Sequence, residues 1–480
     1  MFNVRRIILF LTAISLMFTI CACGGSGAES GNNVDVDSAN FGAGFPDVDL
    51  SEGIKVTEEK ITITCGFDLV EIAGTLTRGE ELLKSFREKY PNITINFEPM
   101  TNSDSRLMSM IAAGNGPDIL RMDSFAEAPS MISRGLVLPL DKYFEAAGIN
   151  VDELSQVQSL FKFDGQKRGQ GYTYGIVKDF SFDNAIWINK ATFREAGIEI
   201  PSDTEPLTYT EFAELARKLT VKDGKTIKRF GFTTSNDIMR LVEPMLNSSG
   251  KSLWSEDGKT NNLTEDYAVE EFNYWSDLMK EGVMPSTLHP ISETDGFGSL
   301  VEGKVAMVVG GYWLGAKSTL YGDGKNEDIM LLPSPKADDG KEINTALFGT
   351  GLGIFASSPN PNEAFMLLNE LLLGEESVKL RAEYGWGVPI VKSAEQYLPE
   401  ATSAQKQWKD VTLRQLSNYS TDARVSPFVL YNGATSTFSK YYNLFLYDKA
   451  DLSSTLNKIS GQLDILVEEG MAYARQASSK

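Results

Sequence analysis

Residues 171–220 read GYTYGIVKDFSFDNAIWINKATFREAGIEIPSDTEPLTYTEFAELARKLT, and this stretch predicts the fold class. Its pattern indicates an extended segment, a buried strand, a short helix ending at Gly197, a loop bounded by prolines, and an amphipathic helix. Thr208 and Glu211 have the spacing of a capping box at the start of that helix. Apolar residues follow from Phe212 at helical spacing, so we expect this face to be core. A strand followed by a helix is the repeating unit of α/β proteins.

The residues before this stretch repeat the same unit. Residues 61–67 (ITITCGF) and 93–99 (ITINFEP) alternate as strands do, and the helix between them is predicted to start with a capping box at Thr77 and Glu80. Residues 116–123 (GPDILRMD) predict a third strand. Strand, helix and strand in this order predict a parallel sheet with helices on its faces.

The second half of the chain carries similar signals. Residues 303–313 (GKVAMVVGGYW) predict a buried strand that runs into a glycine-rich turn, and residues 348–356 (FGTGLGIFA) predict another strand. Asn360 and Pro361 suit the start of a helix that ends at Gly374. We therefore predict an α/β protein with helices on both sides of its sheets.

Composition and charge exclude some classes of protein. The 480 residues are 42% hydrophobic, enough to bury the cores of two or three domains. The formal net charge is −20, and binding to phosphate backbones needs clustered Lys and Arg instead. Nucleic acid is therefore not an expected partner.

The N-terminus predicts export. Two arginines precede the apolar run from Ile7 to Ile20, which is shorter than the roughly 20 residues that a membrane span needs but suits a signal peptide. We predict cleavage after residues 1–22, with Cys23 resembling the lipidated cysteine of a bacterial lipoprotein. Residues 23–58 are rich in Gly, Ser, Asn and Asp and predict a flexible tether. A plain signal peptide cut nearby is the alternative. Cys65 then remains alone in the folded part, so no intrachain disulfide is expected.

Several enzyme signatures are missing from the sequence. It contains no phosphate-binding P-loop, no dinucleotide fingerprint and no nucleophile elbow. His289 is the single histidine, which disfavours a histidine-rich metal site or a Ser-His triad. We predict no metal, no cofactor and no enzymatic activity. A carboxylate pair of the kind that hydrolyses glycosides stays open, because the chain has 65 acidic residues.

The candidate site residues are aromatic and acidic side chains at the ends of predicted strands or in glycine-rich loops. A sugar presents an apolar C–H face and a rim of hydroxyls, so aromatic rings and polar side chains together suit a sugar site. Each candidate also has a structural alternative, packing for the aromatics and helix capping for the acids, and Trp187 is predicted to be core. The candidates are Phe67, Asp68, Asp123, Tyr172, Trp313 and Trp386.

The order of several motifs resembles the extracellular solute-binding proteins of ABC importers, in the carbohydrate-type family that includes maltose-binding protein. The resemblance covers most of residues 60–395. The motifs are FREKYPNITINF (86–97), IAAGNGPDILRMD (111–123), GLVLPLDKYF (135–144), YGIVKDFSFDNAIWINKATFREAGIEIP (174–201), EGKVAMVVGGYW (302–313) and ALFGTGLGIFASSPNPNEAFMLLNELL (346–372).

This resemblance implies a two-lobed periplasmic-binding-protein-like fold of type II, with a hinge between lobes that are discontinuous in sequence. The expected first lobe comprises residues 59–177 and 334–374, and the second comprises residues 178–333 and 375–480. By position, the chain should cross between lobes near Ile176–Ser181, near Met330–Pro335 and near Gly374.

The resemblance also implies a function. We expect a monomeric, lipid-anchored receptor on the outer face of the cell membrane. It should capture a sugar, with an oligosaccharide as the expected ligand, and pass it to ABC permease subunits. Trp313 and Trp386 match stacking positions of the family, and Asp68 and Asp123 match loop positions that bond sugar hydroxyls. Many relatives carry tyrosine where this chain has Trp187. The alternatives are a receptor of the same fold for a polyamine or peptide, and a secreted carbohydrate-active enzyme.

Overall fold

The computed structural model describes residues 49–73, 75–98, 105–123, 126–165, 167–291, 296–321, 323–344, 349–420 and 424–478. The predicted signal peptide, Cys23 and most of the predicted tether lie outside these ranges. The end of the predicted tether is bonded to the folded part, because the backbone N–H of Thr57 donates to Glu363 and the backbone oxygen of Lys55 accepts from Asn362. Cys65 is a free, buried cysteine.

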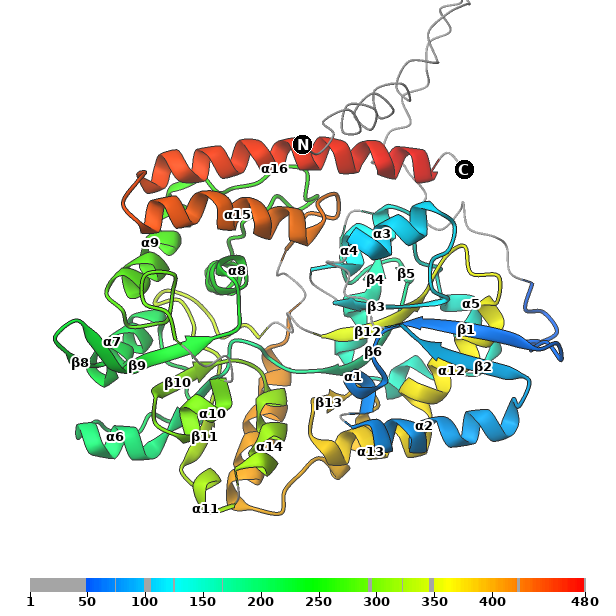
Figure 1. The fold of residues 1–480 in the computed structure, drawn as a ribbon, viewed down its shortest axis with the longest axis horizontal. Coiled ribbons are helices and arrows are strands. Elements are labelled where there is room, and N and C mark those ends of the chain that lie inside the picture. Colours follow the sequence, from blue (N-terminus) through cyan, green and yellow to red (C-terminus); the bar gives the residue numbers. More distant parts are fainter. Residues whose placement is uncertain are drawn as a thin grey trace, which may run out of the picture. The chain divides into compact units, whose positions relative to one another are not determined.

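A six-stranded sheet organises the first lobe (Figure 1). Strands β1, β2 and β3 are parallel, while β12 is antiparallel to both β3 and β6, and β13 is antiparallel to β6. The order across the sheet is β13 (Val388–Pro389), β6 (Ile176–Phe180), β12 (Thr350–Ile354), β3 (Ile119–Asp123), β1 (Ile61–Gly66) and β2 (Ile93–Phe97). The sheet thus joins strands from both ends of the folded chain.

A five-stranded sheet organises the second lobe. Strand β10 is parallel to β9 and antiparallel to β7, and β11 is antiparallel to β7. The order is β11 (Ile329–Leu332), β7 (Ile186–Asn189), β10 (Val305–Val309), β9 (Thr226–Thr234) and β8 (Val221–Asp223). A separate two-stranded ribbon pairs β4 (Lys162–Phe163) with β5 (Tyr172–Thr173).

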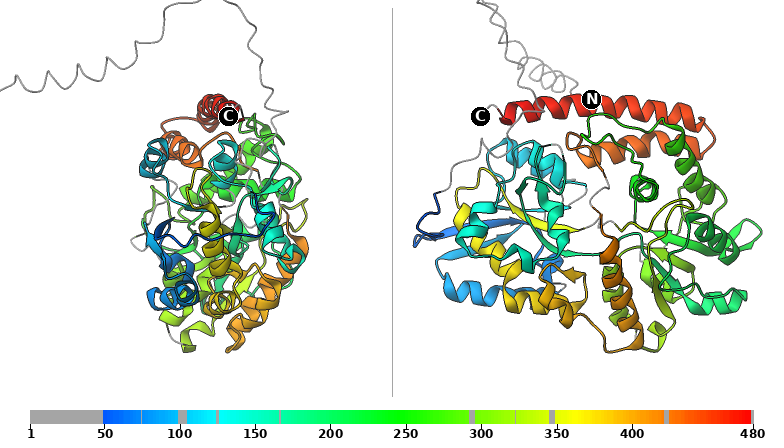
Figure 2. Two further views of the ribbon diagram at one scale, coloured as in Figure 1. Left: turned by 90° about the vertical axis from the view of Figure 1, so that its right-hand side faces the viewer. Right: turned by 180° about the vertical axis from the view of Figure 1, so that it is seen from behind.

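Helices cover both sheets (Figures 1 and 2). Those that follow strands of the first sheet are α1 (Leu69–Ala73), α2 (Leu76–Lys89), α3 (Ser105–Ala112), α4 (Ala128–Ser133), α5 (Asp141–Ala146), α12 (Pro361–Leu373) and α13 (Glu375–Tyr384). The others are α6 (Lys190–Ala196), α7 (Tyr209–Leu219), α8 (Ile238–Ser248), α9 (Asp266–Lys280), α10 (Gly296–Val301), α11 (Asp323–Asn326), α14 (Ser403–Gln415), α15 (Tyr431–Leu446) and α16 (Leu452–Ser478).

The two predicted capping boxes had different outcomes. At α7 the prediction is confirmed, because the Thr208 side chain accepts from the backbone N–H of Glu211 and the Glu211 carboxylate accepts in return. At α2 the prediction is wrong. The helix begins two residues earlier than predicted, and the Thr75 hydroxyl caps it by accepting from the backbone N–H of Arg78. Glu80 is then free to pair with Arg87 along the helix.

The chain passes between the sheets close to two of the three predicted places. It leaves the first sheet after Phe180 and enters the second at Ile186, and it returns between Leu332 and Thr350. Near Gly374 the structure differs from the prediction. Helix α13 packs against α2, and β13 then pairs with β6, so the residues directly after Gly374 still belong with the first sheet. The other lobe limits remain predictions.

The C-terminal helices contact both halves of the protein. Helix α16 packs against α15 and α9 in the second lobe and against α4 beside the first sheet (Figures 1 and 2). The segment before α15 adds polar contacts, because the Ser133 hydroxyl donates to Pro427 and Arg134 donates to Phe428. The last helix therefore lies across the two lobes on one side of the molecule.

Candidate functional site

One edge of the first sheet collects the ends of several strands. Strands β3 and β6 end there, and β12 begins there because it runs in the opposite direction. Thr350 is in register with Asp123 on one side and with Asp179 on the other. The carboxyl ends of strands in α/β sheets are where ligands usually bind. This edge therefore places acidic and hydroxyl side chains in one row.

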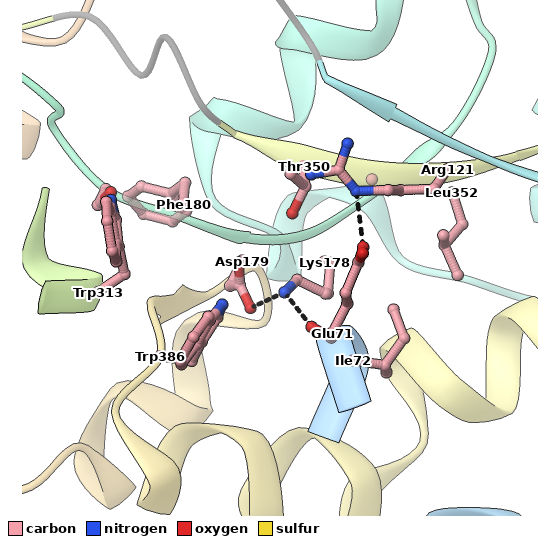
Figure 3. Close-up of a pocket in the computed structure, with 12 residues that line it drawn as sticks. Glu71, Ile72, Arg121, Lys178, Asp179, Phe180, Trp313, Thr350, Leu352 and Trp386 are labelled. Carbon is pink, nitrogen blue, oxygen red and sulfur yellow. Dashed lines mark hydrogen bonds and ion pairs between the residues drawn. The ribbon is translucent and has the colours of Figure 1, made fainter. Parts of the chain in front are cut away.

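A cavity of about 300 Å³ opens at this edge, and we call it the tryptophan cavity (Figure 3). Its size is at the lower end of the range for small-molecule sites. Residues of β3, β6 and β12 form one part of it, while Trp313 reaches it from the turn after β10 of the second sheet. The lining residues are Glu71, Ile72, Arg121, Lys178, Asp179, Phe180, Ser181, Trp313, Thr350, Gly351, Leu352 and Trp386.

Charged side chains pair with each other on one side of the tryptophan cavity. The Arg121 Nε lies 3.0 Å from a carboxylate oxygen of Glu71. The Lys178 Nζ lies 3.0 Å from the Asp179 carboxylate and donates to the backbone oxygen of Glu71 at 2.8 Å. Burial lowers the pKa of Lys178, and the neighbouring Asp179 partly opposes this shift. These groups offer both donors and acceptors to a polar ligand.

A buried arginine supports this charged side. Arg381 of α13 donates to the backbone oxygens of Lys178 and Leu372. Burial lowers its pKa to about 10, and the Asp179 carboxylate opposes that shift. Arg381 thereby fixes the backbone of β6 at the residue whose side chain faces the cavity.

Aromatic rings form the other side of the tryptophan cavity (Figure 3). The Trp313 and Trp386 ring centroids are 6.4 Å apart and their planes are inclined by 41°. Trp386 also stacks on Tyr384 at 5.8 Å, and the Lys317 ammonium lies over the Trp313 ring. Both tryptophans are only partly buried, so their faces remain available for contact. Trp313 follows a second-sheet strand and Trp386 precedes a first-sheet strand, so the two rings come from different lobes.

The structure separates Phe67 and Asp68 from these tryptophans. Phe67 is only 1% exposed and packs edge-on against Phe97 in the core of the first lobe. It does not line the tryptophan cavity, which fits the packing alternative. The Asp68 carboxylate accepts from the backbone N–H of Val70 at the start of α1, which is the capping alternative. Asp68 lies three residues before Glu71, which does line the cavity.

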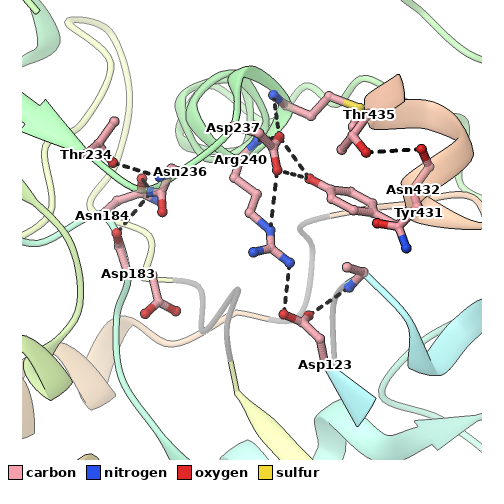
Figure 4. A network of polar contacts seen from close by, with 12 residues as sticks. Asp123, Asp183, Asn184, Thr234, Asn236, Asp237, Arg240, Tyr431, Asn432 and Thr435 are labelled. Carbon is pink, nitrogen blue, oxygen red and sulfur yellow. Dashed lines mark hydrogen bonds and ion pairs between the residues drawn. The ribbon is translucent and has the colours of Figure 1, made fainter. Parts of the chain in front are cut away.

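Asp123 belongs to a polar network between the lobes (Figure 4). Its carboxylate accepts from Arg240 of α8 at 2.8 Å and from the backbone N–H of Ala126 at 2.8 Å. The Arg240 guanidinium also lies over the ring of Tyr431, and the Tyr431 hydroxyl donates to Asp237 at the N-terminus of α8. Asp123 is not among the residues that line the tryptophan cavity, and ligand contact by Asp123 stays a prediction.

Tyr172 lies on the β4–β5 ribbon. It is 46% exposed and pairs with Phe163 across the ribbon. It is absent from the lining of the tryptophan cavity. Trp187 is fully buried, as predicted, and its indole N–H donates to the backbone oxygen of Gly311.

Sequence reasoning missed the charged residues of the cavity. Lys178 and Asp179 interrupt an apolar strand, IVKDF, and this interruption was the available signal. All five residues of that strand are buried, and charged side chains are rarely buried unless they are paired. Arg121 sits likewise in the third strand. Glu71 gave no signal beyond its place in a loop after the first strand.

No metal or membrane feature accompanies the site in the part of the chain that the structure describes. Within residues 49–478, gaps excepted, no cluster of His, Cys, Asp or Glu has the placement of a metal site. Across the same residues no helix is long and apolar enough to span a membrane. The ring of His289 contacts the backbone oxygen of Lys280, in a loop away from the tryptophan cavity.

Comparison with known proteins identifies the class. A family model for the bacterial extracellular solute-binding proteins matches residues 73–376, and the chain belongs to this family. A putative binding protein of Brucella abortus is 23% identical over 322 residues, covering 65% of this chain and 72% of that protein. The family and its structural neighbours are binding proteins rather than enzymes.

Solved structures show the same two-lobed fold. An ABC substrate-binding protein of Listeria monocytogenes, solved in complex with cycloalternan, superimposes with a TM-score of 0.68 at 20% identity, covering 86% of this chain and 98% of that one. UgpB of Mycobacterium tuberculosis, in complex with glycerophosphocholine, superimposes with a TM-score of 0.64 at 16% identity, covering 85% and 98%. The protein is therefore a bacterial extracellular solute-binding protein with this two-lobed fold.

Proposed function

We propose that the protein captures a sugar of more than one ring in the tryptophan cavity and delivers it to the permease of an ABC importer. The observation that carries the proposal is the meeting of Trp313 and Trp386, from different lobes, above paired charged side chains. The aromatic faces suit the C–H face of a sugar, and the charged groups suit its hydroxyls. Movement of one lobe relative to the other would bring the two rings together on the ligand.

Isothermal titration against a panel of sugars tests this proposal. The panel contains glucose, tagatose, maltose, maltotriose, mannobiose and mannotriose, together with spermidine, a tripeptide and glycerophosphocholine. Saturable binding of a sugar with a stoichiometry of one supports the proposal. Binding of a non-sugar solute with no binding of any sugar would overturn it. A thermal-shift screen is a quicker first step, since a ligand at a hundred times its Kd adds about 2.7 kcal/mol of stability.

A receptor for a cationic solute is the second candidate. Two tryptophans beside the carboxylates of Glu71 and Asp179 are also suitable for an ammonium group. Because Arg121 and Lys178 already pair with these carboxylates, we favour the neutral, hydroxylated ligand. Spermidine and glycerophosphocholine in the panel separate the two candidates.

We further propose that Cys23 carries a lipid anchor, that the receptor is a monomer and that it has no catalytic activity. Full-length protein with Cys23→Ser should move from the membrane fraction to the soluble fraction, while the unchanged chain stays with the membrane. Light scattering should give one chain per particle, 52.8 kDa for the unprocessed chain. Release of reducing sugar from polysaccharide by the purified protein would contradict the absence of catalysis.

A further inference from the structure

The C-terminal helices of the second lobe are joined to the first lobe at one small junction. Helix α16 packs against α15 and α9 in the second lobe and also contacts α4 of the first lobe (Figures 1 and 2). We call this junction the interlobe clasp. Its residues are Ser133 and Arg134 at the end of α4, Pro427 and Phe428 before α15, and Gly470 and Tyr473 on α16.

Arg134 is the central residue of the interlobe clasp. Its guanidinium donates to the backbone oxygen of Phe428 at 2.9 Å, and it also donates to the backbone oxygen of Ser130 in its own helix. The same guanidinium lies over the Tyr473 ring, 5.9 Å from the ring centroid. Hydrogen bonds from a charged donor are about twice as strong as neutral ones. One side chain of the first lobe thus holds two segments of the second.

The backbone of the second lobe is closely packed at the interlobe clasp. Phe428 is 1% exposed, and its carbonyl oxygen lies against Gly470, where an added Cβ would be only 1.8 Å from that oxygen. On the side of the first lobe, Ser133 is fully buried and its hydroxyl donates to the backbone oxygen of Pro427. Separation of the lobes at this point would therefore break hydrogen bonds between buried groups, which opposes the separation.

The interlobe clasp holds the part of the first lobe that continues from the tryptophan cavity. Arg121 of β3 lines that cavity, and α4 is the next element along the chain. Between them Ala126, 4% exposed, packs in the hydrophobic cluster of the second lobe together with Phe428. The arrangement of the lobes that forms the clasp is also the one in which Trp313 and Trp386 line a single cavity. The clasp and a ligand in the cavity therefore favour the same arrangement.

We propose that the interlobe clasp stabilises the closed arrangement of the lobes before a ligand arrives, and that it thereby sets the affinity of the tryptophan cavity. Contacts that exist in only one arrangement raise its population, and the apparent Kd is the intrinsic Kd divided by the populated fraction. Arg134 does not line the cavity, so it acts on binding without touching the ligand. The inference concerns the movement of the lobes and does not depend on the ligand being a sugar.

Small-angle X-ray scattering of the purified protein without ligand tests the interlobe clasp. Arg134→Ala removes the contacts with Phe428 and Tyr473, so the ratio of closed to open protein should fall about tenfold, the value of one hydrogen bond. The radius of gyration should therefore increase. Saturating maltotriose or mannotriose, whichever binds the wild type, should return the radius to the wild-type value. The Kd for that sugar should increase by about threefold to tenfold.

Gly470→Ala and Gly461→Ala form a matched pair on α16. A Cβ at Gly470 would overlap the Phe428 oxygen, so this variant should push α16 away and increase the radius of gyration as Arg134→Ala does. A Cβ at Gly461 meets no atom within 4 Å. Both variants gain the same helix propensity, but Gly461→Ala should keep the radius and the affinity of the wild type.

Lys167→Ala is the control for interlobe contact in general. Lys167 forms an ion pair with Glu256 of the second lobe, but the two side chains are 42% and 63% exposed. An exposed ion pair contributes little, so this variant should scatter as the wild type does.

The outcomes separate a clasp from a merely structural contact. If neither Arg134→Ala nor Gly470→Ala increases the radius of gyration without ligand, the inference is overturned, even where their thermal midpoints fall. An increase of the same size in Gly461→Ala or Lys167→Ala overturns it as well. If no sugar binds the wild-type protein, the proposed function fails, while the scattering comparison still decides whether the interlobe clasp controls closure.

Discussion

Asp123 at the end of β3 and Arg240 on α8 form an ion pair between the two lobes, with 2.8 Å between the carboxylate and the guanidinium. Both side chains are about nine-tenths buried, with exposed fractions of 8% and 10%. The pair lies at the carboxyl edge of the first sheet, where sugar contact by Asp123 was predicted. A ligand that uses this carboxylate must therefore share it with Arg240.

Removal of Arg240 should destabilise the protein strongly. Arg240→Ala leaves a buried carboxylate without its cation, which typically costs roughly 3–5 kcal/mol of unfolding free energy. The matched control is Arg194→Ala, because Arg194 pairs with Asp328 at the same distance of 2.8 Å but with 56% and 41% of the side chains exposed. An exposed pair contributes about 0–1 kcal/mol. Urea denaturation measures the free energy of unfolding of both variants. An equal decrease in the two variants would contradict a stabilising role for the buried interlobe pair.

Trp313→Ala and Trp386→Ala should each weaken sugar binding at least about tenfold, because each removes an aromatic face from the tryptophan cavity. Both side chains are partly exposed, so the thermal midpoint without ligand should change little. Trp275→Ala is the contrasting variant, since Trp275 is 1% exposed in the core of the second lobe. It should lose roughly 3–5 kcal/mol of stability. Unchanged titration curves for both cavity variants would contradict the assigned site.

Phe67→Ala and Tyr172→Ala should differ in stability but not in sugar affinity. Phe67 is buried against Phe97, and its truncation should cost roughly 3–5 kcal/mol. Tyr172 is 46% exposed, and its truncation should stay within about 0.5 kcal/mol. Titration of the folded fraction of each variant measures affinity. If either variant stays folded but loses sugar affinity, the substituted residue contacts the ligand after all.

Gly311→Ala should disturb the site through the crossing segment. A Cβ on Gly311 would fall on the side chains of Ser181 and Asp183, which lie between the two sheets, and close to Trp313. Sugar affinity should fall together with the thermal midpoint. Gly324→Ala is the control, because a Cβ at Gly324 meets no atom within 4 Å. If Gly311→Ala binds sugar as tightly as the wild type, the crossing segment that contains Ser181 and Asp183 adjusts without moving Trp313.

Glu271 on α9 should make the folded protein less stable as the pH rises. Burial, followed by the nearby Glu270 and opposed by Lys251, raises the pKa of Glu271 from its ordinary 4.5 to about 7. Between these values the folded chain keeps a proton that the unfolded chain has released, so the free energy of unfolding falls as pH rises from about 4.5 to about 7. Glu271→Gln should match the wild type near the acid end of this range and exceed it above neutral pH.

Thermal midpoints measured across this pH range check the prediction for Glu271. Glu468→Gln changes an exposed carboxylate on α16 and serves as the control, with the same pH dependence as the wild type. An unchanged pH profile in Glu271→Gln would show that the Glu271 carboxyl ionises normally in the folded protein.

Local sequence patterns predicted the helices and strands well, because the formation of a helix or strand depends largely on residues that are close in sequence. Alternation identified β1 and β2, and the Thr208–Glu211 capping box marked the start of α7. The same local rules failed where two candidate capping residues were close in sequence. Before α2, Thr77 was predicted to cap the helix, but Thr75 does so.

The site was less predictable because its contacts join distant parts of the chain. Glycine-flanked loops singled out Trp313 and Trp386, and both line the tryptophan cavity. Phe67 lies next to Asp68, but the alternation of β1 directs its ring into the core. The pairing of Asp123 with Arg240 joins residues 117 positions apart, and no local pattern contains that information.

The order of strands in the first sheet also constrains how the chain folds. Strand β6 lies between β12 and the edge strand β13, and β13 is not complete until residue 389 has been synthesised. The sheet that starts at Ile61 therefore stays incomplete while most of the second lobe is being made, and α16 adds its bridge between lobes last. Native contacts of such long sequence separation slow folding. The first sheet can therefore be completed only after the segment that forms β13 has been made.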